Sequence, residues 1–436
     1  MSLSRSQLII IGGVTLVVLF VVALLVFGSR EALNPPREEL VVWGVFDESN
    51  MFQEGISAFQ KGVRKNTQIT YLKKNEQTYE QDLIQALAAG KGPDIFMFHN
   101  AWLPKHFDKI APQSETTLPL ATLRALFPQV VEQDFAPDGV IFALPLYIDT
   151  LALYWNKDYF DRKSIASPPR TWEEFQTLVP RLRELDATGR VVKAASAIGG
   201  SLKSVNRATD MVSLLMLQAG AKMTDDNFNR ATFTVSVGGG QVPGQNALEF
   251  YTQFANPASS VYTWNDSLHY SVDNFAEGDA ATMFNYSYQT ALLRAKNPFL
   301  KFDIAPMPQP QDTAQPVNFA NYWGFAVSKK SAQTDIAWQF VKFFTTDTAL
   351  MRAYMEKSKH PPALRALVGE AQTDPNLGVF AQQALTARSW PQIDSALVER
   401  SFSDMIEAVI SGRLSARNAL KEAEDTISNQ MQTKKR

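Results

Sequence analysis

Short apolar runs alternate with amphipathic helical patterns after residue 40, and this alternation limits the folds available to the chain. The runs LVVWGVF, ITYLK and DIFMF begin at Leu40, Ile69 and Asp94, and they have the length and the β-branched or aromatic content of buried strands. The segments between them carry apolar residues at helical spacing: Ile56, Phe59 and Val63, then Tyr79, Leu83 and Leu87. Strands that alternate with helices predict parallel βαβ units, in which ligands bind beyond the carboxyl ends of the strands.

The later parts of the chain continue this pattern. Thr171 and Glu174 have the spacing of a capping box at a helix start, and Pro180 predicts a kink in that helix. Further helices are expected at residues 210–217, 245–254, 335–344 and 403–410. The strand-like runs KFDIAP and WGFAVS lie between helices late in the chain. This order predicts an α/β protein in which two lobes exchange strands.

The residue types present exclude several classes of function. The 436 residues include 42 Lys and Arg and 44 Asp and Glu, for a net charge of −2, so the chain lacks the basic balance typical of nucleic-acid binding. It contains no cysteine and four histidines, and no two histidines have the i, i+4 spacing of a helical zinc site. We therefore expect no metal, no other cofactor and no nucleic-acid partner.

Residues 8–27 form an uncharged apolar run, LIIIGGVTLVVLFVVALLVF. A helix of about 20 residues spans about 30 Å, the thickness of a bilayer's hydrocarbon core. We interpret residues 1–28 as a single-pass transmembrane anchor of an extracytoplasmic protein, and residues 29–39 as a short linker stiffened by a Pro pair. A cleaved signal peptide is the alternative, although its apolar region is usually about 7–15 residues long and a small-x-small site follows it.

Six segments of the soluble part resemble the extracellular solute-binding proteins of family 1, the relatives of maltose-binding protein. In the family's order they are LVVWGVF, AAGKGPDIFMF, ALPLYIDTLALYWNKDYF, PPRTWEEF, FAEGDAATMFNYSY, and NYWGFAVSKKS with AWQFVKFF. The resemblance covers nearly all of residues 40–430. It implies a two-lobe periplasmic-binding-protein-like fold of type II, a ligand cleft between the lobes, hinge closure on binding, and a partner ABC permease with its ATPase.

The sequence departs from the family's pattern in three ways. Trp155 stands where the family usually has a tyrosine before Asn-Lys-Asp, and Thr282 precedes Met283 where the methionine is expected one position earlier. Many relatives are lipoproteins, whereas this chain has an apolar N-terminal run and no cysteine. The last difference alters the anchor but not the cleft.

We expect the chain to cross between the lobes three times, near residues 146–150, 302–306 and 345–350. On this division, residues 40–147 and 303–347 form one lobe. Residues 148–302 and 348–432 form the other.

Aromatic and polar side chains gather at the predicted strand ends, and this combination suits a sugar. Aromatic rings pack on the apolar faces of pyranoses, while carboxylates and amides bind hydroxyl groups. Strand ends and resemblance together predict ligand contacts by Trp43, Phe46, Asp47, Glu48, Phe98, His99, Asn100, Trp102, Asp149, Trp264, Asn285, Tyr286, Tyr288, Tyr322 and Trp323. The resemblance implies that Asp149 is a ligand-binding carboxylate and that Tyr288 belongs to an aromatic platform.

These assignments have structural alternatives. Trp43 also suits a core, Asp47 a helix cap, and Asp149 a hinge salt bridge, while the segment 98–102 also suits a surface loop. Asp94 is interpreted as a structural turn or cap residue. Arg207, which precedes the predicted helix, would suit an anionic ligand group but is interpreted as a solvated surface arginine.

The sequence thus predicts a non-enzymatic receptor that binds a small solute, a sugar or an oligosaccharide, and delivers it to an importer. A glycoside-acting enzyme is one alternative, because Asp47, Glu48 and Asp149 are carboxylates that can meet in a cleft. A sensor or scaffold that binds without transport is a second. Ferric-iron capture by Tyr286 and Tyr288 is a third and weaker one.

Overall fold

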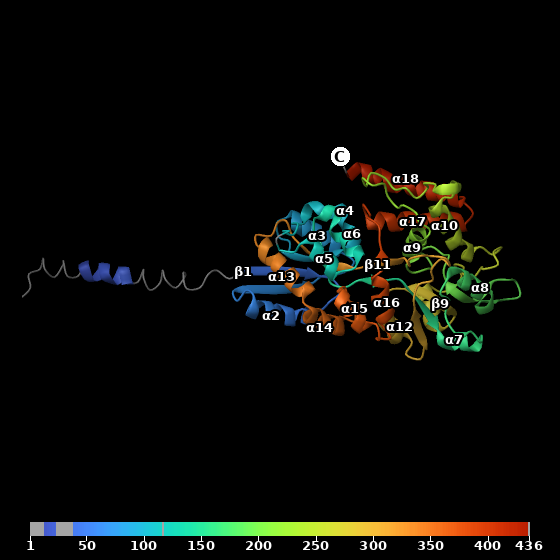
Figure 1. The fold of residues 1–436 in the computed structure, drawn as a ribbon, viewed down its shortest axis with the longest axis horizontal. Helices are drawn as coiled ribbons and strands as arrows, with labels where there is room; N and C mark the ends of the chain where they lie inside the picture. The colour runs from blue at the N-terminus through green and yellow to red at the C-terminus, as the bar shows by residue number, and fades with distance from the viewer. Residues whose placement is uncertain (1–12, 23–37, 116, 435–436) are drawn as a thin grey trace, which may run out of the picture.

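The computed structural model describes residues 13–22, 38–115 and 117–434. The described residues from 38 onward form two large hydrophobic cores side by side (Figure 1). Each core is built on its own five-stranded sheet. We call the half that contains the N-terminal strands the first lobe and the other half the second lobe.

The first lobe contains the predicted parallel βαβ units. Its strands are β1 (Glu38–Gly44), β2 (Thr67–Lys73), β3 (Ile95–His99), β4 (Ala143–Pro145) and β12 (Trp323–Val327). Their order is β2-β1-β3-β12-β4, with β1 parallel to β2 and β3, and β12 antiparallel to β3 and β4. The three strands predicted from residue 40 to residue 98 are therefore confirmed.

Eight helices pack with the first sheet or along its edges. They are α2 (Gln53–Gly62), α3 (Tyr79–Ala88), α4 (Leu103–His106), α5 (Leu120–Leu126), α6 (Gln129–Phe135), α13 (Thr334–Thr346), α14 (Thr348–Ser358) and α15 (Arg365–Ala371). Phe59 and Leu83 are buried as their helical spacing predicts. Val63 is exposed, because α2 ends at Gly62 and the chain turns away after it.

The second lobe has a mixed sheet of order β10-β6-β9-β8-β7. Its strands are β6 (Ala152–Asn156), β7 (Glu184–Leu185), β8 (Val191–Ala197), β9 (Ala280–Asn285) and β10 (Phe302–Ala305). Its helices are α7 (Lys157–Arg162), α8 (Trp172–Leu182), α9 (Ala208–Gln218), α10 (Pro243–Thr252), α11 (Ser271–Glu277), α12 (Gln289–Lys296), α17 (Ser395–Ile410) and α18 (Ala416–Lys434). A further helix, α16 (Gly378–Ala384), lies between the lobes, with Phe380 in the second core and Ala384 in the first. The Thr171 hydroxyl caps α8, accepting a hydrogen bond from the Glu174 amide at 3.1 Å.

The segments that connect the lobes form a small sheet of their own. It contains β5 (Asp149–Thr150), β11 (Asn318–Asn321) and β13 (Ala387–Arg388), in the order β13-β11-β5. The chain passes from one core to the other at each of these strands, for example from Ile148 in the first core to Leu151 in the second. We call this the crossing sheet. Its three strands tie the lobes together at one place, as a hinge requires.

The structure places two of the three expected crossings elsewhere. β10 pairs with β6 in the second sheet, so the chain returns to the first lobe at β11 and not at residues 302–306. Leu350 and Tyr354 belong to the first core, so the last crossing lies at β13 and not at residues 345–350. The predicted lobe boundaries at 303 and 348 shift accordingly. Local sequence pattern does not encode these points, because long-range pairing decides which sheet a strand joins.

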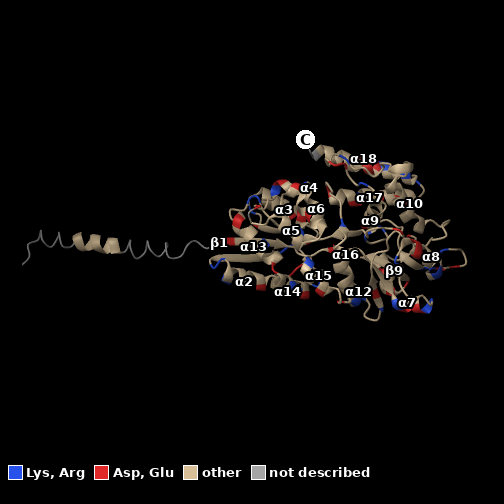
Figure 2. Cartoon of the chain, viewed as in Figure 1, with Lys and Arg blue, Asp and Glu red and all other residues tan. Residues whose placement is uncertain are grey.

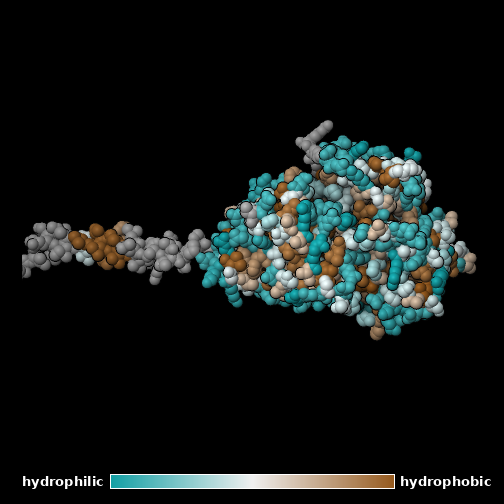
Figure 3. Space-filling view, viewed as in Figure 1, coloured by the Kyte–Doolittle hydropathy of each residue, from teal (hydrophilic) through white to brown (hydrophobic). Residues whose placement is uncertain are grey.

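Residues 13–22 are helical and apolar, and they are the brown segment outside the lobes in Figure 3. The rest of the predicted anchor, residues 1–12 and 23–28, lies outside the described residues, as do residues 29–37 of the predicted linker. Within the described ranges, no helix combines the length and the apolar content needed to cross a bilayer. Acidic and basic residues are interspersed over both lobes (Figure 2), in keeping with the small net charge.

Candidate ligand-binding cleft

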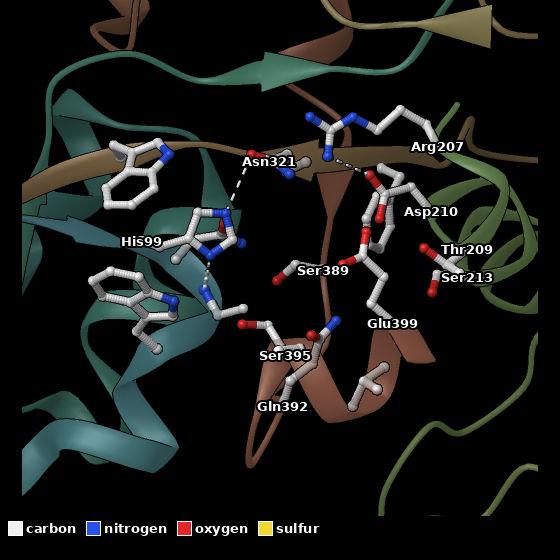
Figure 4. A pocket seen from close by; sticks show the side chains of 18 of the residues that line it. His99, Arg207, Thr209, Asp210, Ser213, Asn321, Ser389, Gln392, Ser395 and Glu399 are labelled. Atoms are coloured by element: carbon white, nitrogen blue, oxygen red, sulfur yellow. Dashed lines mark hydrogen bonds and ion pairs between the residues drawn. The ribbon is translucent and has the colours of Figure 1, made fainter. Parts of the chain in front are cut away.

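Two cavities meet between the lobes. Their volumes are about 330 and 590 Å³. They share six lining residues, which are Phe46, Glu76, His99, Arg207, Asn321 and Trp323, so they are two arms of one cleft. We call the smaller one the first arm, seen in Figure 4, and the larger one the second arm. Both lobes and the crossing sheet contribute to the walls.

The first lobe supplies an aromatic wall made of Phe46, His99, Trp102 and Trp323. Trp323 begins β12 directly opposite His99 at the end of β3, so these residues share one edge of the sheet. The Trp323 ring meets those of Phe46 and Trp102 edge to face, with ring centroids 5.4 and 5.0 Å apart. Edge-to-face packing fixes the rings while leaving ring surface toward the cleft.

The second lobe supplies a platform made of Tyr286, Tyr288 and Arg207. The two tyrosine rings follow β9 and lie nearly parallel, with centroids 6.3 Å apart. The Arg207 guanidinium lies 5.3 Å from the centroid of the Tyr286 ring and 5.7 Å from that of the Tyr288 ring. Its Nε and Nη2 donate to the Tyr288 hydroxyl at 3.1 and 2.8 Å. The platform is therefore a preorganised polar and aromatic surface.

Arg207 is held in place by its backbone and by an acidic neighbour. It precedes α9 with a positive φ of 61°, a conformation that costs a non-glycine residue about 1–3 kcal/mol and recurs at binding sites. Asp210, one turn into α9, accepts a hydrogen bond from the Tyr286 hydroxyl at 2.8 Å and lies 3.9 Å from Arg207 Nη1. Figure 4 shows this pair facing His99 across the first arm.

The charges that line the cleft are mostly negative. Among the described residues that line the two arms, Arg207 is the single Lys or Arg, whereas the carboxylates are Glu76, Glu80, Asp149, Asp210 and Glu399. Burial raises the pKa of Asp210, and the Arg207 charge offsets part of that rise. Burial, and then the charge of Asp210, raises the pKa of Glu399. The described ranges contain no cluster of His, Asp and Glu suited to a metal ion.

Of the two titratable residues nearest the crossing sheet, Asp149 is buried and His99 is partly buried. Burial lowers the pKa of His99 to about 4, so its ring is neutral at pH 7, and its Nε2 lies 3.2 Å from Asn321 Oδ1. Burial raises the pKa of Asp149 to about 6, while hydrogen bonds from Ser287 act in the opposite direction. Both residues line the second arm.

The sequence profile of bacterial extracellular solute-binding proteins matches residues 55–379. The chain belongs to this family. The match covers the aromatic wall from His99 onward, the whole crossing from β4 to β6, and the platform. The resemblance noted in the sequence is thereby confirmed.

Other members of the solute-binding family are similar over almost the whole chain. The galactooligosaccharide-binding protein of Bacillus subtilis is 20% identical over 416 residues, which cover 91% of this chain and 90% of that protein. The maltodextrin-binding protein of the same organism is 22% identical, covering 88% of each chain. The solved structure of the cyclic alpha-maltosyl-1,6-maltose binding protein from Arthrobacter globiformis has a TM-score of 0.74 at 20% identity, covering 91% of this chain and 99% of that one. This chain therefore has the α/β fold of the sugar-binding members.

The structure places about half of the predicted contact residues of this solute-binding protein along the cleft. The ones that line an arm are Phe46, His99, Asn100, Trp102, Asp149, Tyr286, Tyr288 and Trp323. Asn100 is already bonded within the protein, because its amide nitrogen donates to Asp134 at 3.0 Å and its oxygen accepts from the Tyr322 amide at 3.2 Å.

Four predicted aromatic contacts instead lie in the hydrophobic cores. Trp43, Phe98 and Tyr322 belong to the first core and Trp264 to the second. For Phe98 and Tyr322, at the strand ends, the reason is alternation, because successive side chains of an extended chain point to opposite faces. Phe98 therefore points into the core, whereas the next residue, His99, points to the cleft. In the same way Tyr322 points into the core and Trp323 to the cleft.

The remaining predicted contacts are polar residues that do not line either arm. Asp47 is buried and accepts from the Tyr354 hydroxyl at 2.7 Å. Asn285 donates to the Asn206 side chain at 3.0 Å. Glu48 is exposed and forms an ion pair with Lys73 at 2.6 Å. The side chains of these three residues are thus bonded to other protein side chains and not directed to the cleft.

Sequence reasoning missed several residues of the cleft. Arg207, interpreted as a surface residue, lines both arms, and Asp210, Asn321 and Glu399 were not considered. The spacing of Arg207 and Asp210 at the start of α9 was a usable signal, because residues three apart share a helix face. No sequence pattern indicated Glu399, because it lies on α17, far in sequence from the other residues of the cleft.

Proposed function

We propose that this protein is the extracytoplasmic receptor of an ABC importer and that it binds a sugar or oligosaccharide between its lobes. The observation that carries the proposal is the cleft in which the aromatic wall of one lobe faces the tyrosine platform of the other. Aromatic faces on both sides, with amides and carboxylates between them, match a ring that has two apolar faces and a polar rim. Two similar proteins, named for binding galactooligosaccharide and maltodextrin, support the same class of ligand.

The charge of the cleft further restricts the class of ligand. Arg207, the single Arg among the described lining residues, is already engaged by Tyr288 and Asp210, whereas Glu76 and Glu399 add negative charge from the two lobes. An anionic ligand would meet this repulsion at close range. We therefore propose that the ligand is neutral and not an acidic sugar, an amino acid or another anion.

A thermal-shift screen tests this proposal. Maltotriose, maltotetraose and mannobiose are compared with a galacturonate trimer, glutamate and spermidine on the fragment from residue 38. A neutral oligosaccharide at 100 times its Kd should add about 2.7 kcal/mol to the free energy of unfolding. Stabilisation by the acidic or amine compounds, with no response to neutral sugars, would overturn the assignment. Release of reducing ends from the oligosaccharides would identify an enzyme instead.

We further propose that ligand binding closes the cleft about the crossing sheet. A ligand that contacts both lobes binds the closed form better than the open one, and this difference shifts the population toward closure. Small-angle scattering should show a smaller radius of gyration when the sugar identified in the screen is saturating. An unchanged radius would leave a rigid binding scaffold as the better description.

The importer and the anchor complete the proposal. The family relationship supports a permease with its ATPase as the partner of the closed form. The uncharged run at residues 8–27 supports a tether that keeps the receptor beside its permease. Mass spectrometry of the mature protein from membranes should find residues near Met1, and a mature start near Ser29 would show cleavage instead.

A further inference from the structure

One aspartate of the second arm has both of its carboxylate oxygens bonded within the protein. Asp149 Oδ1 accepts from the Thr150 amide at 2.9 Å and from the Ser287 amide at 3.2 Å. Its Oδ2 accepts from the same Ser287 amide at 3.0 Å and from the Ser287 hydroxyl at 2.7 Å. The residue is 3% exposed, so little of the carboxylate remains for a ligand.

Ser287 lies between Tyr286 and Tyr288 in the sequence. Its hydroxyl and amide therefore attach Tyr286 and Tyr288 to the crossing strand β5, which contains Asp149. The far side of the platform is attached separately, because the Tyr286 hydroxyl donates to Asp210 and Arg207 donates to the Tyr288 hydroxyl. Among the hydrogen bonds of the described residues, the Asp149 contact is thus the one that links the platform to the crossing sheet.

The same strand leads to the aromatic wall. Asp149 pairs with Asn321 across β5 and β11, and the Asn321 side chain lies 3.2 Å from the His99 ring. A continuous series of contacts therefore runs from His99 of the first lobe through the crossing sheet to Ser287 of the second. The crossing sheet is therefore in direct contact with the loop that carries the platform.

From these contacts we propose that Asp149 is a positioning residue that couples the sugar platform to the hinge through Ser287. The proposal rests on the function proposed above, since it assigns Tyr286 and Tyr288 to ligand binding. It replaces the expectation that the Asp149 carboxylate contacts the ligand. Ser287, which the sequence did not single out, becomes as important for binding as Asp149 itself.

Hydrogen exchange of the ligand-free protein gives the first test. The variants Ser287→Ala and Asp149→Asn each weaken the contact, and amides of residues 286–292 should exchange roughly tenfold faster in both, the factor that corresponds to one charge-assisted hydrogen bond. Ser411→Ala is the matched control, because it removes an exposed serine hydroxyl bond at the end of α17. Unchanged exchange at 286–292 in both variants, or an equal increase throughout both lobes, would overturn the proposal.

Titration with maltotriose separates positioning from ligand contact. If Asp149 positions the platform, Ser287→Ala and Asp149→Ala weaken maltotriose binding by similar factors of about tenfold or more, and the double variant adds little. If Asp149 contacts the sugar, Ser287→Ala keeps near-normal affinity while Asp149→Ala loses it, and the proposal fails. Should the unaltered protein bind no sugar in the screen, the proposed function fails, and the exchange result still decides whether Asp149 holds the platform.

Discussion

Replacing Trp264 with alanine is expected to lower the free energy of unfolding by about 3–5 kcal/mol, the range for removing a large aromatic side chain from a packed interior. Trp264 is fully buried in the second core, and its indole nitrogen donates to the Ser204 hydroxyl at 3.2 Å. The variant loses both the packing and the hydrogen bond. Urea unfolding followed by circular dichroism measures the loss.

Because the sequence predicts Trp264 to be a ligand contact, the same variant also tests whether Trp264 lies in the core or in the cleft. A core residue changes stability without changing the ligand-dependent part of the thermal shift. The matched variant is Phe299→Ala, because Phe299 is 89% exposed in the same lobe, and its stability should change by less than about 0.5 kcal/mol. Normal stability of Trp264→Ala together with lost sugar binding would contradict the structure.

Replacing Trp323 with alanine is expected to weaken sugar binding by about 2 kcal/mol, or roughly thirtyfold in Kd. Trp323 lines both arms of the cleft and joins Phe46 to Trp102 in the aromatic wall. Its removal takes away ring surface from the ligand and support from its two neighbours. Isothermal titration with the oligosaccharide found in the screen measures the loss.

Two comparisons make this result specific. Trp323→Phe keeps an aromatic face and should recover most of the affinity, whereas Phe299→Ala, outside the cleft, should leave the affinity unchanged. Trp323 is only partly buried, so the alanine variant should remain folded. Equal affinity of the unaltered protein and Trp323→Ala would exclude the aromatic wall from ligand binding.

The strand ends at the cleft show why the sequence predicted the region but not each residue. It located the ends of β3 and the start of β12, because apolar runs of strand length are a local signal. It did not decide which of two adjacent residues faces the ligand. Phe98 and Tyr322 are in the core, while their neighbours His99 and Trp323 line the cleft, because the facing of a strand is fixed by what packs on each side.

The platform shows a second limit to prediction from the sequence. Tyr286 and Tyr288 were predicted from the family pattern, and both line the second arm. Their partners Arg207 and Asp210 precede them by about 80 residues, and no periodicity connects segments that far apart. The strained backbone of Arg207 is likewise a property of the folded chain alone.

The sequence by itself determined the local elements of the first lobe, the cap of α8 and the strand ends around which the cleft forms, because each of these depends on side-chain spacing within a short segment. The family was indicated by the resemblance of six segments in order along the chain. Only the tertiary structure decided where the chain crosses between the lobes and which aromatic rings are core. It also decided that Arg207, Glu399 and the Asp149–Ser287 contact come together at the cleft. Those features depend on pairing and packing between residues distant in sequence, and that long-range complementarity exists only once both lobes have folded.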